Sequence, residues 1–500
     1  MGKSLPIFNG PALTGALGSI QQQVTQFFTP TPQGEAPHDG RTVDDFKPYL
    51  VALNLTKRCN LKCNHCYLDA TTKAAGGDDE LSTEECFTLI DQIAEVNKGC
   101  LLVITGGEPL VRPDILDIAR YAVKLGFMVV FGTNGMLIDD RMAKTLVEIG
   151  VMGVGISIDS LDPAKHNAFR GVPGAWEAAV AGIEASKRNG LQFQVHFSAQ
   201  PMNYTELPTV IDWAHQLGAR VLNVFFMVCT GRGEELTDIT PAQYEEVLGY
   251  LVTCQDNYKG MLVRARCAPH FKRLAYEKDP NSPITKATGY MGGGCLAGTN
   301  YARVTPNGEL TPCPYMPLSA GNVRQNSFAD LWDKSDVFNS FRYPQLKGKC
   351  GDCEYTDICG GCRARPYVDH GDWLDEDQWC LYTPKGGEKI KVAFNTPEES
   401  EVAWDDASAL RLSRIPYFLR AMVKKGVEKH ARENNVPLIT IELMEELQIP
   451  ISTTSTRNAM KPICRSNADR SRVAIGKSWP KTSTPTGTSS SSWARWGSAQ

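Results

Sequence analysis

The stretch NLTKRCNLKCNHCYLDA, residues 54–70, places three cysteines and a tyrosine directly after an apolar run. The spacing is C-x3-C-x2-C followed by an aromatic residue, and the side chains are Cys59, Cys63, Cys66 and Tyr67. Closely spaced thiolates are typical ligands of iron–sulfur clusters and of zinc. A structural zinc site takes four ligands, so the loop alone leaves one coordination position open. Since an open position is where a metal site meets its substrate, we expect chemistry at this loop.

Six apolar, β-rich runs alternate with helical patterns along residues 47–265. The runs are LVALNL (50–55), CLLVIT (100–105), FMVVFGT (127–133), MGVGISI (152–158), FQVHFSA (193–199) and RVLNVFF (220–226). Strands that alternate with helices indicate βα units around a parallel sheet. Because a closed barrel of this kind needs eight strands, the count predicts an α/β fold with an open, partial (β/α)6 TIM-like barrel. The cysteine loop follows the first strand, at the end where such barrels place their active sites.

The rest of the chain divides by composition into further segments. Residues 1–46 form a lead-in interrupted by proline and glycine, residues 266–380 are rich in cysteine, and residues 381–400 have the character of a linker. Residues 401–450 are predicted to be a small helical domain, with Leu419, Met422, Val423 and Val427 on one face. Residues 451–500 are basic and rich in Ser and Thr, a composition typical of a disordered tail.

The bulk composition excludes several classes of protein. The net charge is -4 over 500 residues, which gives no basic excess that would indicate a nucleic-acid partner. No run approaches the roughly 20 apolar residues of a membrane span, and the N-terminus has no secretory apolar region. We therefore expect a cytoplasmic protein, in which 16 cysteines indicate metal binding rather than disulfides. Cysteines in apolar helical or strand contexts are expected to pack in the core, namely Cys86, Cys100, Cys229 and Cys254; Cys464, in the tail, has no assigned role.

Polar motifs end three further predicted strands. They are GGEP (106–109), TNG (133–135) and SIDS (157–160). Glycines permit a close approach of the backbone to a ligand, and Glu108 is suited to accept a hydrogen bond from an ammonium group. A plain Gly-rich turn is the alternative for the first motif. Asp159 is equally suited to cap the helix that follows.

In this context the cysteine loop resembles that of the radical S-adenosylmethionine family, over roughly residues 47–265. The resemblance implies that Cys59, Cys63 and Cys66 hold a 4Fe–4S cluster whose open iron binds S-adenosylmethionine, which is then cleaved to a 5′-deoxyadenosyl radical. It also implies cofactor-binding roles for Tyr67, Gly106, Gly107, Glu108, Asn134, Ser157, Asp159 and Arg170. The alternatives are a zinc site or three unrelated thiols.

The cysteine-rich segment resembles the SPASM extension of that family, which holds auxiliary iron–sulfur clusters. By this resemblance one auxiliary 4Fe–4S cluster is held by Cys350, Cys353, Cys359 and Cys380. A second would be held by Cys295, Cys313 and Cys362, with Cys267 or a substrate atom as the fourth ligand. The usual pattern has three residues between the last two cysteines of the run, whereas here there are two, so the partition of ligands stays open. One or two zinc ribbons are the alternative.

Two further features resemble enzymes of tetrapyrrole metabolism. The segments TPTPQG (29–34), RCAPHF (266–271) and 292–317 resemble the heme d1 and alternative heme biosynthesis enzymes. Residues 404–440, with an IP-x-F-x-R start at Ile415–Arg420, resemble a small C-terminal domain of light-independent protochlorophyllide reductase, although a plain packed helical pair is the alternative. The resemblance implies modification of tetrapyrrole side chains by oxidative decarboxylation, acetate removal or propionate oxidation. It also implies an electron donor such as flavodoxin or ferredoxin.

Other functions remain open at this point. A maturase of a ribosomal peptide or protein would typically carry an N-terminal peptide-binding domain, for which residues 1–46 are short, since a small independent core needs about 80 residues. A non-enzymatic metal scaffold has no need of the GGEP and SIDS strand ends. His270 is suited to ligate iron or to pack. Basic residues near it are suited to pair with substrate carboxylates or to form a solvated face, namely Arg264, Arg266, Lys272 and Arg273.

Overall fold

The computed structural model describes residues 46–70, 79–236, 238–286, 294–390, 402–414 and 417–447. The chain divides into two units, Met1–Ser452 and Thr453–Gln500, and the whole second unit lies outside the described residues. The predictions for the lead-in up to residue 45, for residues 391–400 of the linker, for the basic tail and for Cys464 also fall outside them.

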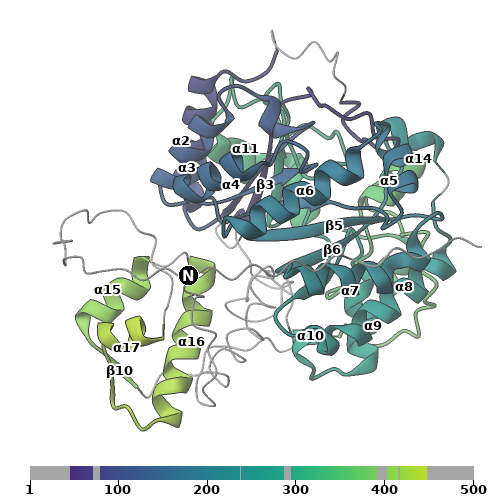
Figure 1. The fold of residues 1–500 in the computed structure, drawn as a ribbon. Coiled ribbons are helices and arrows are strands. Elements are labelled where there is room, and N and C mark those ends of the chain that lie inside the picture. Colours follow the sequence, from purple (N-terminus) through teal and green to yellow (C-terminus); the bar gives the residue numbers. More distant parts are fainter. Residues whose placement is uncertain are drawn as a thin grey trace, which may run out of the picture. The chain divides into compact units, whose positions relative to one another are not determined.

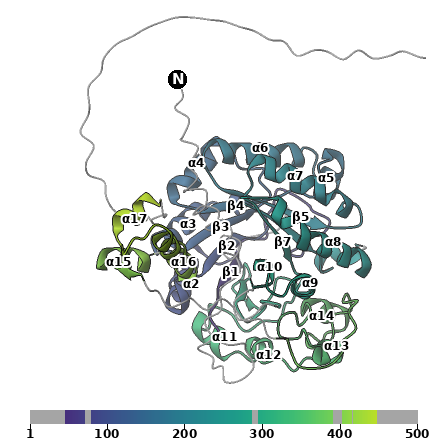
Figure 2. The ribbon, with the colours of Figure 1, turned by 90° about the horizontal axis from the view of Figure 1, so that it is seen from below.

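A nine-stranded sheet forms the centre of the first unit, in the order β7-β6-β5-β4-β3-β2-β1-β8-β9 (Figures 1 and 2). Neighbouring strands from β7 to β8 are parallel, and β9 is antiparallel to β8. The strands are β1 (Leu50–Asn54), β2 (Leu101–Thr105), β3 (Met128–Thr133), β4 (Gly153–Ser157), β5 (Phe193–Ala199), β6 (Val221–Phe226), β7 (Leu262–Arg266), β8 (Tyr301–Val304) and β9 (Leu310–Thr311). The partial barrel and its six predicted strands are confirmed, and the sheet continues beyond them at both edges.

Helices follow the strands in alternation and cover the outer face of the barrel (Figure 2). They are α2 (Thr83–Asn97), α3 (Ile115–Lys124), α4 (Asp140–Ile149), α5 (Pro163–Arg170), α6 (Ala175–Arg188), α7 (Leu207–Leu217) and α8 (Pro241–Cys254), with short 3-10 turns η2 (Pro109–Val111), η3 (Tyr204–Glu206), η4 (Gly231–Glu235) and η5 (Gln255–Asn257). Sequence signals explain where they start: Ser82 and Glu85 form a capping box at α2, as Thr240 and Gln243 do at α8. Their apolar faces and the outward strand residues form one core.

The inner face of the sheet changes character along the strands. Near the amino ends, apolar side chains fill the barrel in one cluster, namely Leu101, Met128, Val130, Val221 and Leu262. Towards the carboxyl ends the inward residues are polar, as in β5, where Gln194, His196 and Ser198 are half-buried between fully buried neighbours. The apolar floor and the polar mouth place any chemistry of this barrel at its carboxyl end.

The cysteine-rich segment is joined to the barrel through its own strands. Strand β8 pairs with β1, and the indole of Trp332 donates to the carbonyl of Phe46 at 2.9 Å. The predicted boundary between residues 265 and 266 falls inside β7, so this strand belongs to both predicted segments. The helices of this segment are short: α9 (His270–Lys278), α10 (Pro283–Lys286), α11 (Phe328–Lys334), α12 (Asp336–Arg342), α13 (Gly348–Asp352) and α14 (Ala364–His370).

Residues 402–447 form a small helical body with its own core. It contains β10 (Ala403–Trp404), α15 (Asp406–Arg414), α16 (Tyr417–Glu433), β11 (Leu438–Ile439) and α17 (Ile441–Glu446). Val427 is buried there against Leu412 and Met444, as predicted, while the other three side chains of that predicted face lie outside the described residues. No helix in the described part of the chain is long and apolar enough to cross a membrane.

Candidate active site

The three-cysteine loop is clamped by the segments that follow three other strands. After β2, the amide of Gly107 donates to the carbonyl of Thr56 at 2.7 Å, and the amide of Glu108 donates to that of Arg58 at 2.9 Å. At the end of α5, the carbonyl of Arg170 accepts from the amide of Lys62 at 3.2 Å. After β6, Arg232 donates through Nε to the carbonyl of Cys63 at 3.0 Å. These contacts fix the loop at the carboxyl end of the barrel.

The two glycines of GGEP are required by this loop. A Cβ atom on Gly106 would lie 2.5 Å from the carbonyl oxygen of Thr56, and one on Gly107 would lie 2.3 Å from that of Arg58. Gly106 also has a φ of +140°, which L side chains rarely adopt. Both glycines are therefore needed for the close packing of the cysteine loop, in addition to any contact they make with a cofactor.

The three thiols share one shielded, mostly apolar environment. Cys59 is buried, Cys63 and Cys66 are half-buried, and all three pack in a cluster with Leu61 and Ala70. Burial raises the pKa of the Cys59 thiol to about 12, with smaller contributions from Glu108, Cys63 and Cys66. Thiols of this kind stay protonated until a metal replaces the proton. The donor set therefore fits an iron–sulfur cluster that takes three protein ligands.

Arg170 connects this loop to Asp159, which was predicted to bind the cofactor. Its guanidinium donates from Nε to Asp159 at 2.7 Å and from Nη1 to the sulfur of Cys63 at 3.7 Å. Burial alone would raise the pKa of Asp159, but Arg170 holds it below its usual value. Asp159 is fully buried and also accepts from the amide of Ser198 at 3.0 Å, so its carboxylate is engaged inside the protein. Ser157, at the end of β4, is half-buried and faces the barrel interior.

Glu108 ties the ends of two strands together. Its carboxylate is fully buried and accepts from the hydroxyl of Thr133 at 2.8 Å, and from the amide of Asn134 at 2.8 Å. Burial raises its pKa, these hydrogen bonds lower it, and the net pKa is about 7. Asn134 in turn donates to the side chain of Asn60 in the cysteine loop at 2.6 Å. The TNG and GGEP motifs thus act on the loop together.

Tyr67 lies between the cysteine loop and the cysteine-rich segment. Its hydroxyl accepts from Asn54 at 2.9 Å, and its ring packs edge-on against Tyr315 at 5.7 Å. Burial raises its pKa, and both Cys66 and Cys313 raise it further. The aromatic residue that follows the motif therefore bridges two groups of cysteines.

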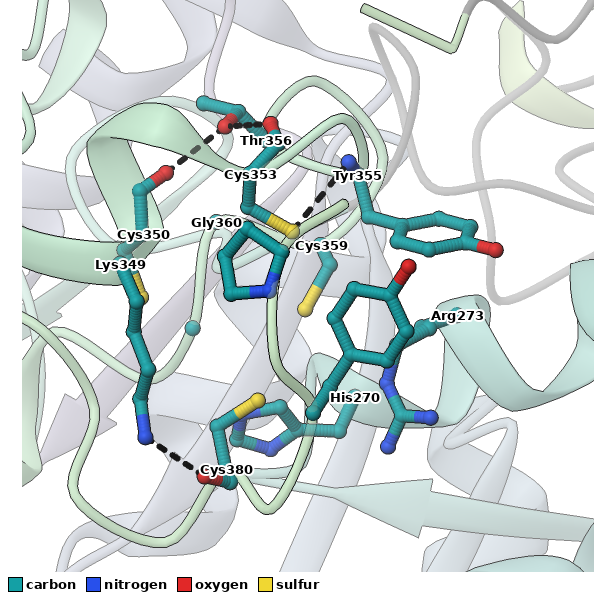
Figure 3. A pocket seen from close by; sticks show the side chains of 13 residues that line it. His270, Arg273, Lys349, Cys350, Cys353, Tyr355, Thr356, Cys359, Gly360 and Cys380 are labelled. Atoms are coloured by element: carbon teal, nitrogen blue, oxygen red, sulfur yellow. Dashed lines mark hydrogen bonds between the residues drawn. The ribbon is translucent and has the colours of Figure 1, made fainter. Parts of the chain in front are cut away.

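A first set of four cysteines lines one common space, shown in Figure 3. The set comprises the predicted Cys350, Cys353, Cys359 and Cys380. Burial raises the pKa of Cys380 to about 11, with a smaller contribution from Cys350. Lys349 and Thr356 hold the surrounding backbone: the lysine donates to the carbonyl of Cys380 at 2.6 Å, and the threonine to that of Cys350 at 2.7 Å. The two-residue spacing after Cys359 does not prevent this grouping.

A second set of four thiols comes together from distant segments, namely Cys267, Cys295, Cys313 and Cys362. Burial raises the pKa of Cys267 to about 12, with smaller contributions from Cys362 and Cys295. Burial also raises the pKa of Cys313, again with contributions from the other three. Cys267 has a φ of +57°, a conformation that non-glycine residues rarely adopt. Cys267, one of the two predicted sources of a fourth ligand, thus lies beside the three cysteines of the predicted second set.

Thiolates bind zinc as well as iron–sulfur clusters, so two sets of four cysteines by themselves suit either kind of metal centre.

Both sets border one cavity of about 260 Å³. Its lining includes Cys295 of the second set and Cys359 of the first, together with Arg342 and Arg363. The two sets consequently lie near each other in the fold.

His270, Arg273 and the four predicted core cysteines lie in different environments. His270 is buried with Nδ1 at 2.9 Å from the hydroxyl of Tyr244, and burial lowers its pKa to about 4. Arg273 pairs with Glu245 and Glu277 inside the protein. The predicted core cysteines Cys86, Cys100 and Cys254 are buried in the main core. Cys229 instead is half-buried and donates to the carboxylate of Asp238 at 3.8 Å.

Some residues that shape the site gave no usable signal in the sequence. Arg232 holds the backbone of Cys63, and Asn60 links the loop to Asn134. Asp377 accepts from the amide of Cys362 at 2.7 Å and pairs with Arg365 at 3.0 Å. These are contacts between segments far apart in the chain, so only the folded structure shows them.

Comparisons with protein families match three segments of the chain. Residues 53–232 match the radical SAM superfamily, and residues 295–362 match an iron-sulfur cluster-binding domain, the SPASM domain. Residues 404–448 match the proto-chlorophyllide reductase 57 kD subunit family. The predicted resemblances are thereby confirmed in all three segments.

Individual proteins agree with this assignment. The AdoMet-dependent heme synthase of Methanosarcina barkeri is 40% identical, over 67% of this chain and 97% of its own length. The PqqA peptide cyclase of Rhizobium meliloti is 30% identical, over 67% of this chain and 88% of its own. The structure of Streptococcus suis SuiB bound to S-adenosylmethionine has the same fold, with a TM-score of 0.56 at 17% identity, and the match covers 67% of this chain and 78% of that one. This chain belongs to the radical S-adenosylmethionine enzymes that carry a SPASM iron–sulfur domain.

Proposed function

We propose that this enzyme converts propionate side chains of an iron tetrapyrrole to vinyl groups, as a step of heme synthesis. The observation that carries the proposal is the 40% identity to an AdoMet-dependent heme synthase across nearly all of that protein. Heme carries vinyl groups at two positions where iron-coproporphyrin III carries propionates, which makes iron-coproporphyrin III the substrate we favour. Acetate removal and propionate oxidation are the other outcomes that this scaffold would support.

Residues of the barrel mouth would hold the radical-generating group. Cys59, Cys63 and Cys66 would bind a 4Fe–4S cluster, and the GGEP, TNG and SIDS strand ends would face its S-adenosylmethionine. When bound, these supply a 5′-deoxyadenosyl radical that removes a hydrogen atom from an unactivated carbon. The residues of the chain keep the thiols out of water and orient the loop through Arg170 and Glu108.

The net change at each side chain needs an electron acceptor. A propionate becomes a vinyl group when it loses one hydrogen atom, one molecule of carbon dioxide and one electron. We assign the acceptor to an auxiliary 4Fe–4S cluster. Eight cysteines form two sets of four suited to such clusters, the second completed by Cys267.

The division of labour in the rest of the chain is part of the proposal. Residues 47–265 would form the radical domain and residues 266–380 the auxiliary domain, whose strands β8 and β9 extend the barrel sheet. Residues 381–400 would form the linker. Residues 401–450 would contribute to tetrapyrrole binding, because they match a family named for protochlorophyllide reductase. Removing residues 401–450 should weaken binding of iron-coproporphyrin III, and unchanged affinity would leave that body with a packing role.

An electron donor and a location complete the proposal. A flavodoxin or ferredoxin would reduce the loop cluster, in the cytoplasm. A reconstitution with each donor in place of dithionite tests the first point, because only a competent donor restores cleavage of S-adenosylmethionine.

The experiment that tests the function compares substrates anaerobically. The protein is reconstituted with iron and sulfide, and 5′-deoxyadenosine is followed with iron-coproporphyrin III, with didecarboxysiroheme, with a short peptide and with no addition. Stimulation by iron-coproporphyrin III together with loss of carbon dioxide supports the proposal. Stimulation by the peptide alone would favour a maturase instead.

A further inference from the structure

Two arginines of β7 point into the mouth of the barrel. Arg264 aligns with Asn223 of β6, which aligns with His196 of β5, and Arg266 aligns with Phe225 in the next row. The neighbours of these arginines in the strand, Val263 and Ala265, belong to the outer core. Both arginines are half-buried, and they occupy the polar, carboxyl-end half of the inner face.

This inner face carries positive charge and no acidic residue. The inward positions of β1 to β8 contain arginine, histidine, amides, hydroxyls and apolar side chains, whereas every Asp and Glu near the mouth, such as Asp159 and Glu108, lies beyond the strand ends. Arg264 and Arg266 are two residues apart in one strand, so their half-buried side chains lie on the same face of the sheet. Two like charges side by side where water is scarce are typical of a site built for an anion.

Hydrogen bonds orient one of the pair. Arg266 donates through Nε to the side chain of Asn223 at 2.9 Å, and Asn223 donates to Gln194 at 2.9 Å. The bond to Asn223 uses Nε, so it does not occupy the Nη groups, which form the edge that binds a carboxylate in two parallel hydrogen bonds. Lys272 and Arg273, also considered from the sequence, are held at other places: Lys272 donates to the carbonyl of Ile284 at 2.8 Å, and Arg273 pairs with two glutamates.

We infer that Arg264 and Arg266 bind the propionate carboxylates that the tetrapyrrole keeps through the reaction. The inference rests on the proposed function and names the part of the substrate that this wall of the barrel recognises. An ion pair stabilises a carboxylate in the ground state, so it would oppose the departure of that same group as carbon dioxide. Anchoring arginines are therefore best matched to side chains that do not react.

The position of β7 in the sheet fits a site for the propionates that do not react. Three interstrand spacings separate β7 from β4, which ends in the SIDS motif, or roughly 14 Å along the curved sheet at ~4.8 Å per spacing. A tetrapyrrole with its side chains spans a comparable length. One edge of the substrate would then lie at β7 while the opposite edge faces the predicted S-adenosylmethionine site.

Binding titrations of the reconstituted full-length protein test the inference. The ligands are iron-coproporphyrin III, its tetramethyl ester and heme, followed by their absorption spectra. The variants are Arg264→Gln, Arg266→Gln and the corresponding lysine variants, with the exposed pair Arg120→Gln/Arg188→Gln as the matched control. Iron and sulfide content are measured for each protein, because Arg266 adjoins Cys267.

We expect each glutamine variant to bind iron-coproporphyrin III more weakly by roughly thirty-fold or more, and each lysine variant to recover part of the loss. Heme keeps only the unreacted propionates, so its affinity should fall by the same factor. The ester should bind the wild type weakly and be insensitive to the variants. The control pair should match the wild type.

The outcomes separate the two proposals. If the wild type binds no porphyrin, both fail. If the wild type binds and turns over iron-coproporphyrin III while the glutamine variants bind it equally well, only the anchor fails. A loss for iron-coproporphyrin III without a loss for heme would show that the arginines hold the reacting propionates, which overturns the assignment. Should the variants lose their clusters, tight binding of the ester by the wild type would still overturn it.

Discussion

Replacing Gly107 with alanine tests how the cysteine loop is held. The new Cβ would lie 2.3 Å from the carbonyl oxygen of Arg58, and both are backbone-anchored. The loop must move by roughly 1 Å to reach an ordinary contact distance. That movement stretches the hydrogen bonds from Gly107 to Thr56 and from Glu108 to Arg58. Overpacking and the weakened hydrogen bonds together should cost roughly 2–4 kcal/mol.

The assay is iron and sulfide content after anaerobic reconstitution, together with formation of 5′-deoxyadenosine. If three clusters of equal size are bound, a displaced loop loses about one third of the iron, and cleavage of S-adenosylmethionine stops. The matched control is Gly249→Ala in α8, where a Cβ meets no atom within 4 Å. This control should keep all its iron and gain up to about 1 kcal/mol of stability, because alanine favours the helix.

The result that would refute this reasoning is a Gly107→Ala protein with full iron content and normal cleavage. A different outcome, in which iron is retained but S-adenosylmethionine no longer binds, would move the role of the glycine from the loop to the cofactor.

Three further predictions concern the same site. Replacing all three loop cysteines with alanine should abolish 5′-deoxyadenosine formation but keep about two thirds of the iron; a zinc-loaded, iron-free product would contradict the cluster assignment. Arg170→Gln leaves the buried carboxylate of Asp159 without its cation and should cost roughly 3–5 kcal/mol in urea unfolding, which Asp159→Asn in the same chain largely restores; an equal loss in the double variant would argue against the pair. Glu108, with a pKa raised by burial to about 7, binds a proton more tightly in the folded state, so stability should fall by about 3 kcal/mol as pH rises from 4.5 to 7. Glu108→Gln should lack that loss, and identical pH profiles of the two proteins would count against a buried carboxyl.

The sequence was sufficient for the parts of the fold that are built from local patterns. Each of the six predicted strands is an apolar run, and each is present. Strand β7 was missed because Arg264 and Arg266 interrupt its apolar run, and they do so because they face a polar barrel mouth. Strand β8 was missed because four residues carry little signal and its partner, β1, lies some 250 residues away in the chain. The feature that hid β7 from the prediction is thus the feature on which the proposed anchor rests.

The candidate site divides in a similar way. Cysteine spacing singled out the loop and the run from Cys350 to Cys362, because these cysteines recur at short intervals, whereas the grouping of Cys267, Cys295 and Cys313 joins distant segments and was not visible in the spacing. The partners of charged residues were not predictable. Asp159 and Glu108 were expected to bind the cofactor, and the fold adds protein partners that were not predicted: Asp159 pairs with Arg170, and Glu108 accepts from Thr133 and Asn134. Such pairings depend on which strand ends meet, and sequence spacing does not encode that.

The measurement that tests the central claim most directly is the mass of the porphyrin after anaerobic turnover with S-adenosylmethionine and dithionite. We predict that iron-coproporphyrin III loses one carbon dioxide and two hydrogens for each converted propionate, with one 5′-deoxyadenosine formed per conversion. An unchanged porphyrin mass, in a protein that binds iron-coproporphyrin III and cleaves S-adenosylmethionine, would contradict the account.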